Sequence, residues 1–150
     1  MRREPYSIEE GTPALRLVSE SVDNYRLTAV ESAALMAALR GRLQPEAPVW
    51  NQLAKVRVRR RDWNGYGAYV EFDPFGDGIA PDPILTESGV AKSSINAPWR
   101  TQPMHCSVLL AEQGIIGTLE FFPIDGENWS AEEMQQLLFG PLEGLKILSR

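Results

Sequence analysis

Apolar and polar side chains alternate on both sides of the dipeptide Asn64-Gly65, in the segment KVRVRRRDWNGYGAYVEFD at residues 55–73. This pattern predicts an antiparallel β-hairpin, because Asn-Gly favours tight turns and alternation is typical of half-buried strands. We expect a register in which the numbers of paired residues sum to 128, with a loop from Asp62 to Tyr66, because this register sorts apolar and polar side chains onto separate faces. The expected pairs are Val58 with Val70, Val56 with Phe72, Arg57 with Glu71 and Lys55 with Asp73.

A second alternating segment, CSVLLAEQGIIGTLEFF at residues 106–122, flanks the dipeptide Gln113-Gly114 and predicts a second hairpin. Both of its faces are largely apolar, so this pair of strands belongs either inside a sheet or under a covering helix or partner. The expected pairs have numbers that sum to 227 and are Val108 with Leu119, Cys106 with Phe121, Leu109 with Thr118 and Ser107 with Glu120.

A capping box predicts where a helix begins before the first hairpin. Thr28 and Glu31 have the spacing at which each side chain satisfies a free backbone amide of the other residue. Apolar residues then recur at helical spacing as far as about Leu43, and Pro45 and Pro48 prevent the helix from continuing much further.

A second capping box, Ser130 with Glu133, predicts a helix from Ala131 to about Phe139 that ends at Gly140-Pro141. The tail that follows, LEGLKILSR, is either a last helical turn or an edge strand, and its pattern does not separate the two.

The remaining segments have weaker patterns. Residues 1–13 resemble a loose arm, and residues 15–22 are a candidate for a strand. Residues 74–105 are rich in proline and glycine and predict a long irregular connection with at most a short strand at 89–94, of a kind that often forms a binding surface or a mobile segment. The order of elements predicts a single α+β domain over residues 1–150, with an antiparallel sheet of about four or five strands built from the two hairpins and an N-terminal and a C-terminal helix packed on one face.

Composition narrows the class of protein. Hydrophobic residues make up 43% of the chain and charged residues 23%, which are ordinary values for a globular domain. No apolar run approaches the roughly 20 residues of a membrane helix, and the first residues lack the apolar core of a secretory signal, so we expect a cytoplasmic protein without a membrane partner. The net charge of −5 disfavours nucleic-acid binding, and it either suits a basic partner or only keeps the protein soluble.

Residues suited to catalysis are few, because the chain has one histidine and one cysteine, the adjacent His105 and Cys106. Neighbours on a strand point to opposite faces, so we expect no catalytic residues, no metal site and no cofactor. The basic cluster of Arg57 and residues 59–61 is either a solvated face paired in part with Glu71 or a site for phosphate or an acidic partner.

Aromatic residues in the expected loops are better candidates for binding. Tryptophan and tyrosine are enriched in interface hot spots, although each of these side chains can instead anchor its own loop to the core. Acidic residues also gather around the exit of the second hairpin and the helix that follows it. The candidate partner-binding residues are Trp63, Tyr66, Trp99, Glu120, Asp125, Glu127 and Trp129.

Two strings within residues 57–129 carry a resemblance to a known family. RRRDWNGYGAYVEF contains an Arg-x-x-x-Gly-x-Gly hairpin, and VLLAEQGIIGTLEFFPIDGENW contains a strand, a glycine turn and a Leu-Glu strand. In these features the chain resembles the small immunity proteins of bacterial polymorphic-toxin and contact-dependent growth inhibition systems. The resemblance implies a cytoplasmic protein that binds and blocks a toxin domain, and it transfers no individual site residue.

The leading hypothesis is therefore a non-catalytic protein-binding inhibitor, an immunity protein whose acidic surface and loop aromatics cover a toxin domain, often a basic one. An alternative is a small-molecule-binding or enzymatic domain with a pocket between sheet and helix, closed by residues 74–105. A third possibility is a homodimer joined through the second hairpin.

Overall fold

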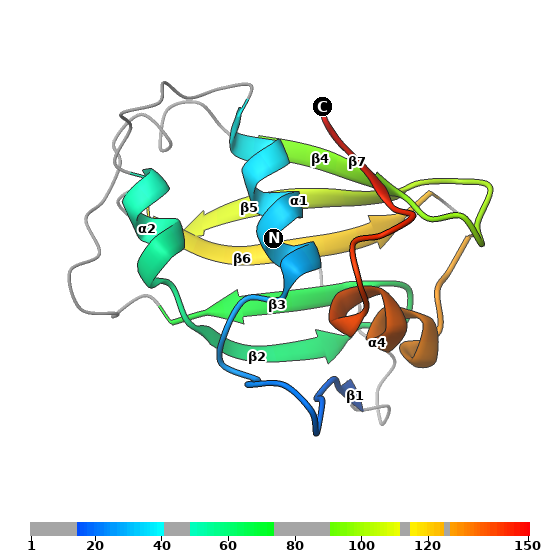
Figure 1. Cartoon of the computed structure of the whole chain (residues 1–150), viewed down its shortest axis with the longest axis horizontal. Coiled ribbons are helices and arrows are strands. Elements are labelled where there is room, and N and C mark those ends of the chain that lie inside the picture. The colour runs from blue at the N-terminus through cyan, green and yellow to red at the C-terminus, as the bar shows by residue number, and fades with distance from the viewer. Residues whose placement is uncertain (1–14, 41–48, 74–90, 112–114, 125–126) are drawn as a thin grey trace.

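The computed structural model describes residues 15–40, 49–73, 91–111, 115–124 and 127–150, which form a seven-stranded antiparallel sheet and three helices (Figure 1). The strand order is β1-β2-β3-β6-β5-β4-β7. The strands are β1 (Leu15–Arg16), β2 (Val58–Trp63), β3 (Ala68–Phe72), β4 (Ala91–Asn96), β5 (Met104–Ala111), β6 (Ile115–Pro123) and β7 (Lys146–Ser149). The helices are α1 (Ala29–Arg40), α2 (Val49–Lys55) and α4 (Ala131–Phe139).

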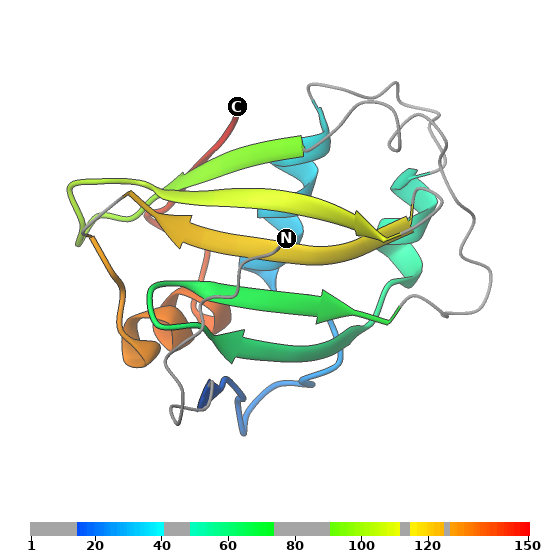
Figure 2. The same ribbon diagram turned by 180° about the vertical axis from the view of Figure 1, so that it is seen from behind.

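Helix α1 crosses one face of the sheet, in front of the strands in Figure 1 and behind them in Figure 2. The core lies between this helix and the sheet, where Leu35 and Leu39 are fully buried together with Leu119 and Phe121 of β6. The opposite face carries no helix within the described residues. The α+β class with an antiparallel sheet is confirmed, but four or five strands were too few, because β1 and β7 are too short to show an alternation of their own.

The register predicted for the first hairpin is wrong. Val58 pairs with Phe72 and Arg61 pairs with Val70, and the register shifts between these two pairs. The extra residue is Arg59, and this β-bulge turns Val58 and Arg61 toward the same buried face. An unbroken alternation would have left Arg61 outside.

Both ends of the first hairpin also differ from the prediction. Lys55 is the last residue of α2, a helix that the sequence pattern did not predict. At the other end, Asp62 and Trp63 belong to β2 rather than to the loop. The chain therefore turns at residues 64–67.

The second hairpin has the predicted register over most of its length, from Met104 opposite Pro123 to Leu109 opposite Thr118. Beyond that point Gly117 is an extra residue, and the pairing shifts by one. The predicted turn at Gln113-Gly114 lies outside the described residues. The interior position is confirmed, because β5 and β6 lie between β4 and β3.

Both predicted capping boxes are present. Thr28 and Glu31 bond each other's backbone amides at the start of α1, and Ser130 and Glu133 do the same at the start of α4. Helix α4 has the predicted bounds and ends at Gly140.

Three weaker predictions have mixed outcomes. The tail is an edge strand, β7, and the short strand expected at 89–94 is β4. Of the segment 15–22, only the two residues of β1 are a strand. The proposed arm at 1–13 and most of the 74–105 connection lie outside the described residues.

Candidate functional site

Trp129, which comes just before the N-cap of α4, contacts β2, the β2–β3 turn and the β4–β5 connection. Its backbone amide donates to the carbonyl oxygen of Tyr66 in the β2–β3 turn at 3.0 Å. Its carbonyl oxygen accepts from the indole Nε1 of Trp63 at 2.8 Å. Its ring lies 6.2 Å, centroid to centroid, from the ring of Trp99 in the β4–β5 connection. One buried tryptophan therefore fixes the relative positions of all three segments.

Arg100 links the ring of Trp129 to acidic side chains at the start of α4. Its guanidinium lies 4.7 Å from the centroid of the Trp129 ring, and it donates to both carboxylate oxygens of Glu133 at 2.9 and 3.1 Å. It also donates to the carbonyl oxygen of Asn128 at 3.0 Å and lies 3.6 Å from the carboxylate of Glu127. The hydrogen bond from Arg100 is the main cause of the lowered pKa of Glu133. Below, the tryptophan platform denotes Trp63, Trp99, Arg100, Trp129 and Glu133.

The structure brings most of the predicted partner-binding residues together at this platform, but it exposes them unequally. Trp99 is 48% exposed, whereas Trp129 is 1% exposed and belongs to the core. Of the two alternatives for a loop aromatic, Trp129 therefore shows the one in which the side chain anchors its loop to the core, and its ring lies against Trp99 and Arg100. Trp63 and Tyr66 are half-buried, and the Trp63 indole N–H is occupied by its bond to Trp129.

The acidic candidates separate in space. Glu127 lies beside Arg100 on the platform, with its side chain 43% exposed. Glu120 lies elsewhere, in the middle of the sheet, where it pairs with Tyr69 of β3 and Ser107 of β5. Asp125 lies outside the described residues.

Arg100 was missed by the sequence analysis. Its main partner, Glu133, is 33 residues away, and no local motif links the two. The spacing of Glu133 and Ser130 indicated a helix cap, but nothing in that pattern shows that the same carboxylate also binds an arginine.

His105 and Cys106 lie on opposite faces of β5, as the strand geometry predicts. Cys106 is fully buried against the core, and burial raises the pKa of its thiol to about 12. His105 lies on the helix-free face, where its ring stacks on Phe122 at 5.6 Å. Its pKa is lowered, first by burial and then by the charges of Arg150 and Lys92. The two side chains therefore lie on opposite faces of the sheet.

Within the described ranges, no three His, Cys, Asp or Glu side chains group closely enough to hold a metal ion. None of the helices in that same part of the chain has the length and apolar character needed to cross a membrane. Comparisons with protein-family models, curated proteins and solved structures found no match. Function is therefore inferred from the geometry and surface chemistry of the chain itself.

Proposed function

We propose that this protein is a non-catalytic protein-binding inhibitor, an immunity protein that neutralises a bacterial toxin domain in the cytoplasm by forming a tight complex. The observation that carries this proposal is Trp99, a large aromatic side chain that is 48% exposed yet packs against the buried Trp129. Exposed aromatic residues of this kind are typical hot spots. Because the platform already restrains Trp99, little conformational entropy is lost when a partner covers it.

Charge around the platform supports a basic partner. Glu127 and Glu132 are acidic residues with exposed side chains near the start of α4, and the whole chain has a net charge of −5. Complementary charge accelerates association, while a buried aromatic contact slows dissociation. The resemblance to immunity proteins over residues 57–129 also implies a protein that binds a toxin domain.

A small-molecule pocket between sheet and helix is the alternative, and two observations favour it less. The described side chains at the interface of α1 with the sheet, such as Leu35 and Phe121, are fully buried in a packed core. The hollow beside His105, of about 240 Å³, lies on the other face of the sheet and not between sheet and helix.

The test compares three tagged proteins, wild type, Trp99→Ala and Leu148→Ala, in affinity purifications from native lysate that are quantified by mass spectrometry. Leu148 is a matched control, because it is 49% exposed but lies on β7. We expect a stoichiometric partner that wild type and Leu148→Ala retain. Trp99→Ala should bind the purified partner about 30-fold more weakly, which corresponds to a hot spot of about 2 kcal/mol.

The purified partner is then expressed in bacteria with and without this protein. Growth arrest that wild type relieves and Trp99→Ala relieves poorly would support the inhibitor function. A partner that is harmless when expressed alone would refute the immunity function, and equal binding by Trp99→Ala would remove the platform from the interface.

A further inference from the structure

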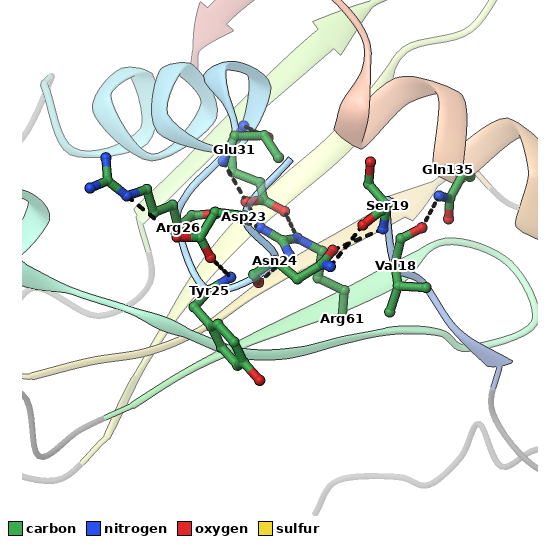
Figure 3. Close-up of polar contacts among 10 residues, drawn as sticks. Val18, Ser19, Asp23, Asn24, Tyr25, Arg26, Glu31, Arg61 and Gln135 are labelled. Carbon is green, nitrogen blue, oxygen red and sulfur yellow. Dashed lines mark hydrogen bonds and ion pairs between the residues drawn. The ribbon is translucent and has the colours of Figure 1, made fainter. Parts of the chain in front are cut away.

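A second surface of opposite charge lies near the start of β2, where α2 ends. The ring of Tyr25 is 57% exposed there, and the guanidinium carbon of Arg57 lies 5.7 Å from its centroid. Figure 3 shows the Tyr25 side chain pointing away from the buried pair of Arg61 and Glu31. The platform, by contrast, includes Trp63 at the far end of β2.

Two adjoining hollows flank Tyr25 and Arg57. One has a volume of about 360 Å³, and its lining includes Arg26 and Lys55 as well as Tyr25 and Arg57. The other has a volume of about 370 Å³, and its lining adds Arg59 and Asp73. The two hollows adjoin, because both are lined by Tyr25 and Arg57, and together they are called the Tyr25 groove below.

The groove is lined by those residues of the basic cluster, Arg57 and residues 59–61, that form no ion pair with another described residue. Arg61 forms a buried ion pair with Glu31. Arg60 forms ion pairs with Glu71 at 3.2 Å and with Asp62 at 3.1 Å. Arg57 and Arg59 are exposed, and neither makes an ion pair with another described residue. A chain of net charge −5 thus carries a local concentration of positive charge along an open depression.

We propose that the Tyr25 groove binds an acidic segment of a protein partner in an extended conformation. Guanidinium groups spaced along a depression suit successive carboxylates, and the Tyr25 ring offers a flat surface for the intervening chain. The side chains of Tyr25, Lys55, Arg57 and Arg59 are all exposed, so the groove suits a strand lying on the surface better than an enclosed small ligand. A long nucleic acid fits less well, because the negative charge of the rest of the protein repels its phosphates. The proposal does not depend on the tryptophan platform.

The test measures fluorescence polarisation of a fluorescein-labelled ten-residue peptide of alternating glutamate and glycine, titrated with the full-length protein at low salt. We expect saturable binding that weakens as salt is added. Arg57→Gln and Arg59→Gln should each weaken it roughly fivefold, since each removes a charge-assisted hydrogen bond at an exposed site. Arg60→Gln is the matched control, because it removes the same charge at the neighbouring position outside the groove, and it should change the affinity less than about twofold.

Three outcomes would overturn the proposal. The first is the absence of binding by wild type. The second is an equal loss in all three variants, which would indicate a diffuse charge effect. The third is tighter binding of a ten-nucleotide single-stranded DNA through Arg57 and Arg59, which would assign the groove to nucleic acid. Thermal unfolding of each variant confirms that it is folded.

Discussion

At the scale of single residues, the ion pair of Arg61 and Glu31 has the largest structural consequence. Both side chains are almost completely buried, and they meet through two hydrogen bonds of 2.5 and 2.9 Å. Arg61 also donates to the carbonyl oxygens of Asn24 and Arg26, each at 2.7 Å (Figure 3). Its guanidinium lies 4.9 Å from the centroid of the Phe139 ring. A single side chain thus joins β2 to α1, to the segment before α1 and to α4.

We predict that Glu31→Gln lowers the free energy of unfolding by about 3–5 kcal/mol, because it leaves the charge of Arg61 buried without its counterion. Glutamine keeps the capping interaction with Thr28, so the loss reports on the ion pair rather than on the helix cap. The control is Glu71→Gln, which removes a partner of the exposed Arg60 and should cost less than about 1 kcal/mol. Urea unfolding followed by circular dichroism measures both, and similar losses in the two variants would contradict the prediction.

A second prediction at this scale concerns His105, whose resonances are unambiguous because the chain has one histidine. We expect an NMR titration of the folded protein to give a pKa below the ordinary 6.5. Lys92→Gln and Arg150→Gln should each raise that pKa, because each removes a positive charge that disfavours the protonated ring. The contribution of His105 to stability is complete above pH 6.5. It is lost as the pH falls, because the unfolded chain then binds the proton more readily. A folded-state pKa at or above 6.5 would contradict this prediction.

At the scale of elements, the β2–β3 turn depends on two glycines for different reasons. Gly65 has a φ of +99°, with open space where a side chain would be. Gly67 lies so close to β6 that an added methyl group would overlap the carbonyl of Phe121. We predict that Gly67→Ala lowers the free energy of unfolding by about 3 kcal/mol, since the obstacle is backbone, and that Gly65→Ala costs about 1 kcal/mol. Thermal or urea unfolding checks the order, and a larger loss in Gly65→Ala would reverse the assignment.

The elements that the sequence predicts well are those whose interactions are local. Both capping boxes join residues three positions apart, and the second hairpin pairs neighbouring strands with apolar residues on both faces. The register of the first hairpin was wrong for two reasons. The chain turns at residues 64–67 instead of 62–66, and the bulge at Arg59 adds one residue that turns Arg61 toward Glu31, which is 30 residues away in the sequence. Long-range pairing of this kind leaves no periodic pattern.

The same distinction holds for the candidate surface. Loop position and residue type were enough to select Trp99 and Trp129 from the sequence. Their exposures differ because Trp99 and Arg100 both cover the Trp129 ring, and Arg100 is held there by Glu133. Burial of this kind depends on contacts between distant segments, so the sequence selected these aromatic residues but indicated neither that they meet nor which of their rings is exposed.

At the scale of the whole molecule, the tryptophan platform and the Tyr25 groove lie at the two ends of β2. The C-terminal strand β7 forms one edge of the sheet. β7 pairs with β4 from Ser149 opposite Ser93 to Lys146 opposite Asn96. The hydroxyl of Ser149 donates to the carbonyl oxygen of Ala37 in α1 at 2.6 Å, so the strand is tied to the helix as well. A homodimer joined through the second hairpin, the third possibility raised by the sequence, stays untested, and sizing of the intact protein tests it. Because β5 and β6 are paired on both sides, such a dimer would have to use a face of the sheet rather than a strand edge.

Removal of residues 146–150 tests how far the edge strand protects the fold. The truncation leaves the outer edge of β4 without its partner and removes the packing of Ile147 against the core. We expect the free energy of unfolding to fall by about 3 kcal/mol, and the unpaired edge to promote self-association that increases with protein concentration. Ser149→Ala is the control, because it removes only the bond to Ala37, should cost about 1 kcal/mol and should associate no more than the intact protein. Light scattering coupled to size exclusion, together with urea unfolding, separates the two effects. A truncated chain that matches the intact protein in both measurements would show that β4 does not need β7, and that the edge of the sheet is protected by its own side chains.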